Sequence, residues 1–199
     1  MPTHDNSGGV AAPAGPTPHH HHPHHHHASP SPPPDAASGQ KVRYPYDHPA
    51  IADFHTAPRY FGAPRSGGRI HAAVDLWAEI FRPIRAVADG TVIQAPYYFY
   101  LGTNALEVHH PGLGTVRYGE ISTVRTVDLH GGEHVKEGQI IAYVGRLDGL
   151  SYQMLHFELY AGTASGPLTV VGNPPFQRRH DLINPTHLME RLQRTAFGH

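Results

Sequence analysis

The chain has no cysteine among its 199 residues, which excludes a disulfide framework and any zinc site built on thiolates. Charged residues are scarce, at 16%, and the net charge is −1 with the histidines neutral. A nucleic-acid binder would normally carry a basic patch, so this balance argues against a nucleic-acid partner. Any metal held by this chain would have to use histidine, aspartate or glutamate.

Long hydrophobic runs are also missing. No apolar stretch approaches the roughly 18–20 residues that a membrane helix needs, so we expect no membrane span. The sequence starts Met-Pro-Thr-His-Asp-Asn, with neither a basic start nor an apolar core. We therefore expect no standard secretory signal peptide.

Histidine, glycine and proline are abundant, with 20, 21 and 20 residues. Residues 1–40 combine Pro, Ala, Gly, Ser and His without hydrophobic periodicity, which predicts a disordered tail. Its two histidine tracts, His19–His22 and His24–His27, favour a solvated spacer, with a metal-gathering arm or a purification tag as alternatives. Residues 41–60 are predicted to be an irregular lead-in, and residues 61–192 a domain.

The remainder of the chain predicts an all-β fold, a compact antiparallel sandwich or barrel-like domain with one short helix near residues 185–192. Two hairpins are expected, one at the Asp89-Gly90 turn within residues 87–93 and one joining residues 106–109 to 115–118. Residues 139–145 resemble a buried strand, and residues 154–160 alternate clearly between apolar and polar.

Two short segments place metal-ligand residues on common faces. In a strand, side chains alternate with period two, so His71 and Asp75 would share one face. The same rule puts His156 on the face opposite Leu155 and Phe157. Two imidazoles and one carboxylate leave a fourth position open, as in a catalytic zinc site. On spacing alone, however, surface residues or structural hydrogen-bond partners remain the alternative.

Longer runs of sequence resemble the lysostaphin/LytM family of zinc endopeptidases, which cleave peptide cross-links in bacterial cell walls. The similar segments occur in the family's order over residues 61–188: a glycine-rich approach to His-x-x-x-Asp, a strand pair, a histidine before a hairpin turn, a Gly-x-x-Val-x-x-Gly-Gln-like stretch, Leu155-His156-Phe157-Glu158 and Asn184-Pro185. The resemblance implies the family's β-rich fold, one zinc ion held by His71, Asp75 and His156, and peptidoglycan peptides as the partner.

Two positions depart from the family pattern. The first histidine of the family's His-x-His is Met154 here, and the catalytic histidine of its Tyr-x-His is Glu120. Zinc-dependent hydrolysis needs a base and a group that stabilises the oxyanion. Glu120 is a candidate replacement base, or alternatively a fourth ligand that closes the site. His110 is a second candidate catalytic residue.

Two strand neighbours carry further expectations. Glu120 follows Tyr118 by two, so both are expected to face the cleft. Glu158 follows His156 by two, and it is expected either to accept the second N–H of that imidazole or to form an ion pair with Arg178 or Arg179.

Two functions from different classes remain open. The first is a zinc metalloendopeptidase that acts on peptidoglycan. The second is a catalytically impaired, zinc-stabilised module that binds cell-wall peptides or regulates a partner. A biotinyl or lipoyl carrier is unlike this chain, because no Met-Lys-Met or Asp-Lys-Ala sequence occurs. The substrate implies the cell envelope or the exterior, and the sequence leaves localisation and oligomeric state undetermined.

Overall fold

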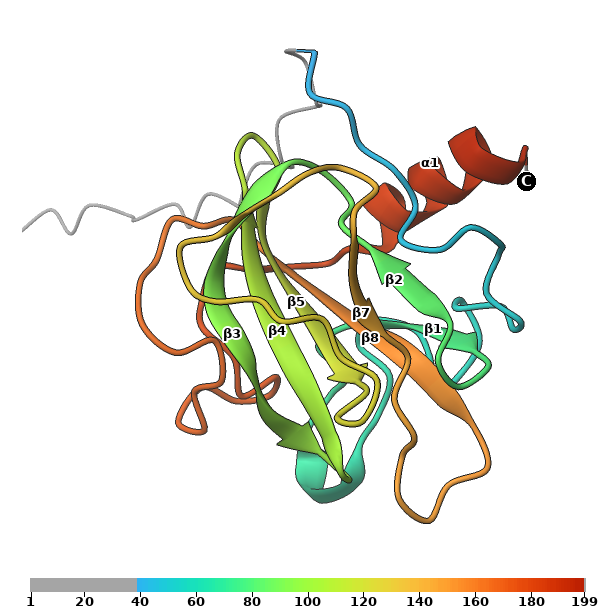
Figure 1. Cartoon of the computed structure of the whole chain (residues 1–199). Helices are drawn as coiled ribbons and strands as arrows, with labels where there is room; N and C mark the ends of the chain where they lie inside the picture. Colours follow the sequence, from blue (N-terminus) through green and yellow to red (C-terminus); the bar gives the residue numbers. More distant parts are fainter. Residues whose placement is uncertain (1–38, 199) are drawn as a thin grey trace, which may run out of the picture. The chain divides into compact units, whose positions relative to one another are not determined.

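A computed structural model describes residues 39–198, and the predicted tail lies almost entirely outside these residues. One large antiparallel sheet organises the described chain (Figure 1). Its strand order is β1-β8-β5-β4-β3-β6, with β9 paired to β8. The strands are β1 Val74–Ala78, β3 Gly90–Tyr100, β4 Thr103–His110, β5 Gly114–Ile121, β6 His134–Val135, β8 Gln153–Tyr160 and β9 Leu182–Ile183.

A second, two-stranded sheet pairs β2, Pro83–Arg85, with β7, Ile140–Tyr143. This pairing corrects one prediction, because β2 and β3 do not form a hairpin about Asp89-Gly90. β3 pairs instead with β4 and β6. The Asp-Gly turn was a local signal, and the strands on its two sides find partners elsewhere. The predicted β4–β5 hairpin and the β7 and β8 strands are confirmed.

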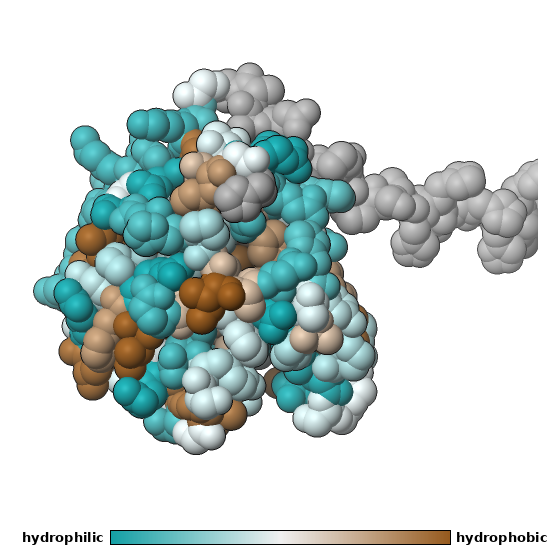
Figure 2. All heavy atoms as spheres, turned by 90° about the vertical axis from the view of Figure 1, so that its right-hand side faces the viewer, coloured by the Kyte–Doolittle hydropathy of each residue, from teal (hydrophilic) through white to brown (hydrophobic). Residues whose placement is uncertain are grey.

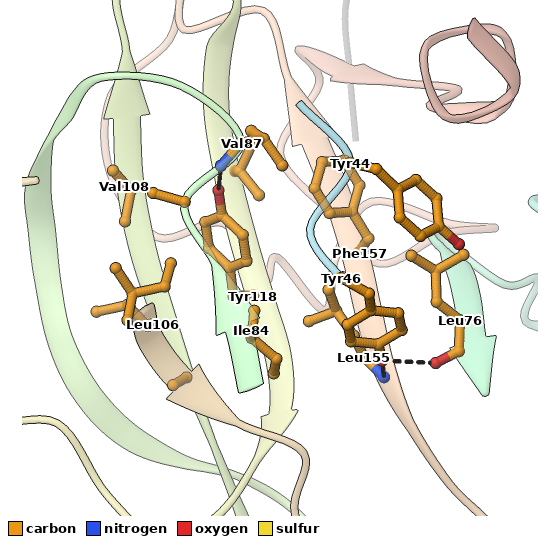
Figure 3. Close-up of a cluster of buried hydrophobic side chains, with 14 of the residues drawn as sticks. Tyr44, Tyr46, Leu76, Ile84, Val87, Leu106, Val108, Tyr118, Leu155 and Phe157 are labelled. Atoms are coloured by element: carbon orange, nitrogen blue, oxygen red, sulfur yellow. Dashed lines mark hydrogen bonds between the residues drawn. The ribbon is translucent and has the colours of Figure 1, made fainter. Parts of the chain in front are cut away.

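The hydrophobic core lies between the small sheet and one face of the large sheet. Residues of β2 and β7 share a buried cluster with alternate residues of β1, β4, β5 and β8. Figure 3 shows Tyr118 directed into this cluster, where its hydroxyl accepts the N–H of Val87 at 3.1 Å. Tyr46 joins two strands in the same way, because its hydroxyl donates to the Leu76 carbonyl and accepts the Leu155 N–H.

Two short helical segments complete the described chain. A 3₁₀ turn, Ser66–Gly68, lies in the loop before β1, and α1 spans Thr186–Phe197. Phe197 of α1 packs edge-on against Tyr44 of the lead-in, with ring centroids 5.3 Å apart. No helix in residues 39–198 is both long and apolar enough to cross a bilayer. The all-β class with one short helix is confirmed.

Candidate metal centre and cleft

The three predicted ligands come together on the face of the large sheet opposite the core. Asp75 on β1 lies directly across from His156 on β8 in the antiparallel register, and directly opposed residues share a face. The Asp75 Oδ1 atom lies 3.0 Å from His71 Nε2 and 3.0 Å from His156 Nδ1. One potential ligand atom from each residue lies within 4.8 Å of the other two.

His71 reaches this centre by a route that the sequence did not predict. β1 begins only at Val74, so His71 and Asp75 do not lie on a common strand. The segment before β1 is held by backbone hydrogen bonds instead, from His71 N to the Ala63 carbonyl and from Gly62 N to the His71 carbonyl. This segment brings the imidazole back over Asp75.

Both imidazoles are oriented by acceptors on their outer nitrogens. His71 Nδ1 lies 2.8 Å from the Tyr60 carbonyl oxygen, and His156 Nε2 lies 2.8 Å from Glu158 Oε1. Burial lowers the pKa of His156, but its hydrogen bonds to Asp75 and Glu158 raise that pKa to about 9, so without metal the inner nitrogen donates to Asp75. The outer oxygens can only accept, so a ring that gives up its inner proton to bind a cation keeps the other proton on the outer nitrogen and turns a lone pair inward. Three electron-pair donors that converge in this way are matched to a cation. Two nitrogens and one oxygen suit zinc better than calcium or magnesium.

Glu158 is a fully buried carboxylate beneath this centre. Both predicted roles are met together, because it accepts from His156 and also pairs with Arg178 at 2.9 Å. Arg117 pairs with its other oxygen at 2.9 Å, whereas Arg179 pairs with Asp181. Burial alone would raise the pKa of Glu158, but Arg117, His156 and Arg178 hold that pKa well below its usual range.

Glu120 enters the cleft through a β-bulge. Tyr118 points into the core, so simple alternation would bury Glu120 there as well, and the expectation that both face the cleft is wrong. The ladder with β4 shifts at this point: Gly119 pairs with Ala105 and Ile121 with Asn104, which leaves Glu120 as an extra residue. Its φ of 61° lies in the left-handed region. Glu120 lines the cleft while Ile121 returns to the core.

The Glu120 carboxylate is buried and incompletely paired. Only 6% of the residue is exposed, and its Oε2 atom has no hydrogen-bond partner among the described residues. Desolvation raises the pKa of Glu120 to about 8, with Asp75 adding to the rise while His156 and Arg65 oppose it. Glu120 is not part of the His71, Asp75 and His156 ligand group. An unpaired carboxyl beside a cation site is poised to exchange a proton.

The structure does not bring His110 to this centre. His110 is fully buried, its Nε2 lies 2.9 Å from the Tyr118 hydroxyl, and its Nδ1 lies 3.1 Å from the Asp89 carbonyl oxygen. Burial lowers the pKa of His110 to about 4. His110 is absent from the residues that line the cleft. Its hydrogen bonds instead connect β4 to Tyr118 of β5 and to the turn before β3.

Gly119 and Phe99 form part of the site although the sequence did not indicate them. The Phe99 ring lies 5.4 Å from the His156 ring, centroid to centroid. A Cβ on Gly119 would come within 2.8 Å of Phe99 Cε1 and 3.0 Å of His156 Cδ2. The absence of a side chain at Gly119 therefore leaves the room that both rings occupy. No local motif marks such a three-way approach.

The centre opens into a cleft with a volume of about 750 Å³. The walls come from the loop before β1, the end of β3, the β7–β8 loop and residues 169–178. On the face drawn in Figure 2, hydrophobic residues form scattered patches among hydrophilic ones. The cleft-lining residues used below are Arg65, Arg69, Asp75, Arg117, Glu120, Met154, His156 and Arg178.

Comparison with known proteins identifies the domain. Residues 69–167 match the model of Peptidase family M23. Lysostaphin of Staphylococcus simulans is 25% identical over 125 residues, and the glycyl-glycine endopeptidase ALE-1 of Staphylococcus capitis is 31% identical over 94 residues. These alignments cover 60% and 47% of this chain. Each alignment spans only 25% of the length of the relative.

Solved structures agree on the fold. The catalytic domain of the antimicrobial peptidase lysostaphin from Staphylococcus simulans superposes with a TM-score of 0.50 at 22% identity, over 66% of this chain and 89% of that one. The cbpa protein of L. salivarius REN superposes with a TM-score of 0.54 at 18% identity, over 75% and 95%. The chain therefore carries a peptidase family M23 domain with the β-rich fold of lysostaphin.

Proposed function

We propose that this chain is a zinc-dependent metalloendopeptidase that hydrolyses peptide bonds of bacterial cell-wall peptidoglycan, with Glu120 as its general base. The family match and the relatives named lysostaphin and glycyl-glycine endopeptidase support the reaction class. The observation that carries the proposal is Glu120 itself, a buried carboxylate with an unpaired oxygen in the same cleft as three converging ligand atoms.

His71, Asp75 and His156 would hold the metal through Nε2, Oδ1 and Nδ1, the atoms that face one another. Zinc bound there would supply Lewis acidity, which polarises a peptide carbonyl and acidifies water. Tyr60 and Glu158 would keep both imidazoles in the tautomer that ligation needs.

Glu120 would take a proton from the attacking water while the water oxygen bonds to the peptide carbonyl carbon. The same carboxyl would then return that proton to the amine nitrogen when the C–N bond breaks. A carboxylate performs this task in the His-Glu-x-x-His proteases. A pKa raised by burial favours the role, because a base works best when its pKa is near the operating pH. Met154 cannot act in this exchange, since a thioether is only a weak acceptor.

A digestion assay tests the base. Zinc-loaded wild type, Glu120→Gln and Glu133→Gln are each incubated with purified peptidoglycan, and released peptides are measured by mass spectrometry. Glu133 is exposed and outside the cleft, so its variant controls for loss of one carboxylate. We expect Glu120→Gln to bind zinc and stay folded but to lose at least about 100-fold in rate. Undiminished hydrolysis by Glu120→Gln would refute the proposed base.

The alternative function, a catalytically impaired module that binds cell-wall peptides, has a distinct signature. Wild type would then bind zinc and peptide stoichiometrically and release no fragment from any cell-wall type. If Glu120 were a fourth ligand, Glu120→Gln would weaken zinc binding, and there would be no activity to lose. The proposed substrate also implies that the protein acts in the cell envelope or outside the cell.

A further inference from the structure

The loop before β1 carries two arginines to the mouth of the cleft. Pro64 and Ile70 form an isolated antiparallel bridge, and the Arg65 N–H donates to the Arg69 carbonyl at 2.9 Å. The intervening Gly67 and Gly68 have φ of 72° and 75°, a conformation that glycine adopts without strain. This tight loop holds Arg65 and Arg69 opposite each other, and both line the cleft.

Arg65 is fixed next to the metal centre. Its Nη2 atom lies 3.6 Å from Asp75 Oδ2, the carboxylate oxygen that the two histidines do not contact. The guanidinium donates to the carbonyls of Pro58 at 2.9 Å and Pro64 at 3.4 Å. These are two of the five N–H groups of arginine, and 29% of the side chain is exposed. Further donors are therefore free to receive a ligand.

Arg69 adds a positive charge that no carboxylate balances within residues 39–198. It is exposed, and its Nε donates only to the Ser66 carbonyl, at 3.5 Å. The other cleft arginines differ, because Arg117 and Arg178 each form an ion pair with the buried Glu158. Arg69 therefore carries a charge with no ion pair among the described residues at the mouth of the cleft, and a divalent metal at the centre would add to the positive potential there.

We propose that Arg65 and Arg69 form a carboxylate-binding subsite, so that the peptide accepted carries a free carboxylate beside the scissile bond. A guanidinium presents paired N–H groups in a fork that fits a carboxylate. Arg65 contacts an oxygen of Asp75, so a carboxylate bound there lies within a few ångströms of the ligand cluster. This inference rests on the proposed function for its substrate class. An uncharged glycine bridge would leave both arginines unused.

Two peptides that differ in one group test the subsite. One is a cross-link peptide with a free carboxylate next to the scissile bond, and the other carries a carboxamide there. Binding to the zinc-loaded, full-length Glu120→Gln protein is measured by calorimetry, so that turnover does not interfere. We expect about 10- to 100-fold tighter binding of the carboxylate peptide, the usual effect of a charged hydrogen bond. Wild-type cleavage of both peptides is measured in parallel.

Arginine variants in the same background locate the preference. Arg69→Gln and Arg65→Gln should each reduce the ratio of the two affinities at least about threefold. Arg146→Gln, which removes an exposed charge outside the cleft, should leave the ratio unchanged. A carboxylate preference that survives in both loop variants would overturn the assignment, as would equal affinity for the two peptides or no binding of either.

The outcomes separate this subsite from the proposed activity. Tighter carboxylate binding without cleavage of either peptide by wild type would support the subsite and contradict the peptidase. Equal cleavage and equal binding of the two peptides would support the peptidase and overturn the subsite.

Discussion

Replacing Glu158 by glutamine tests how the buried ion network supports the metal centre. Glu158 Oε1 accepts hydrogen bonds from His156 Nε2 at 2.8 Å and from Arg178 Nε at 3.0 Å. Its Oε2 accepts one from Arg117 Nε at 3.0 Å. A glutamine has one acceptor oxygen and one NH2 donor. Whichever way the amide is turned, its NH2 group faces a donor on one side. The buried Arg117 and the partly buried Arg178 both lose their counter-charge.

Two magnitudes follow from these contacts. Loss of the acceptor for a ligating imidazole commonly weakens metal binding about 10- to 100-fold, which corresponds to roughly 1.4–2.7 kcal/mol. Removal of one partner from a buried ion pair costs about 3–5 kcal/mol of folding stability. The second cost applies with or without metal, because the ion pairs of Glu158 with Arg117 and Arg178 do not involve the proposed metal ligands. We therefore expect the variant to have a lower free energy of unfolding and to be stabilised less by added zinc.

Urea unfolding, with chelator and then at fixed free zinc, measures both costs. The free energy of unfolding with chelator measures the contribution of the ion network. Its increase on adding zinc measures the zinc affinity. Asp181→Asn is the matched control, because Asp181 pairs with buried Arg179 at 2.7 Å and has no hydrogen bond to a proposed ligand. The control should lose stability yet keep its zinc affinity within about threefold.

One result would refute this reasoning. If folded Glu158→Gln binds zinc as tightly as wild type, the contact with His156 does not support ligation. Should the variant fail to fold, Arg178→Gln keeps the carboxylate and the His156 contact, so its zinc affinity should stay close to that of wild type.

Three further predictions concern the centre and the bulge. In a chain that starts at Lys41, which avoids the histidine tracts, we expect elemental analysis to find one zinc ion per wild-type chain and none in His156→Ala. Stoichiometric zinc in the variant would contradict the ligand assignment. Gly119→Ala should cost about 1–3 kcal/mol in thermal unfolding, because its Cβ would press on Phe99 and His156, and an unchanged melting temperature would count against the packing described. In metal-free protein the Glu120 pKa is raised from 4.5 to about 8, so the folded state retains a proton that the unfolded state releases. Stability should then fall between about pH 4.5 and 8; Glu120→Gln should flatten this slope, and equal slopes would show that Glu120 does not titrate as described.

The sequence by itself determined strand β8, the β4–β5 hairpin and the types of metal ligand. The alternation of Leu155, Phe157 and Leu159 with His156 and Glu158 is a local property, and β8 follows it: the three apolar residues lie in the core cluster. The absence of cysteine restricted the donors to nitrogen and oxygen. The His71, Asp75 and His156 set came from ordered motifs, and the fold brings these residues together.

Only the tertiary structure decided which side chains share the cleft. Period-two counting assumes an unbroken ladder, and the single bulge at Glu120 puts Glu120 in the cleft and returns Ile121 to the core. Nothing in the local sequence distinguishes a core position from a cleft position for His110 and Arg65. In the fold, His110 is held in the core by Tyr118, whereas Arg65 lies against Asp75. Glu158 contacts His156 on its own strand, but it also pairs with Arg117 of β5 and Arg178 of a later loop, which no local pattern connects to it. Local pattern determines what each segment forms, whereas pairing register and loop packing determine what each residue meets.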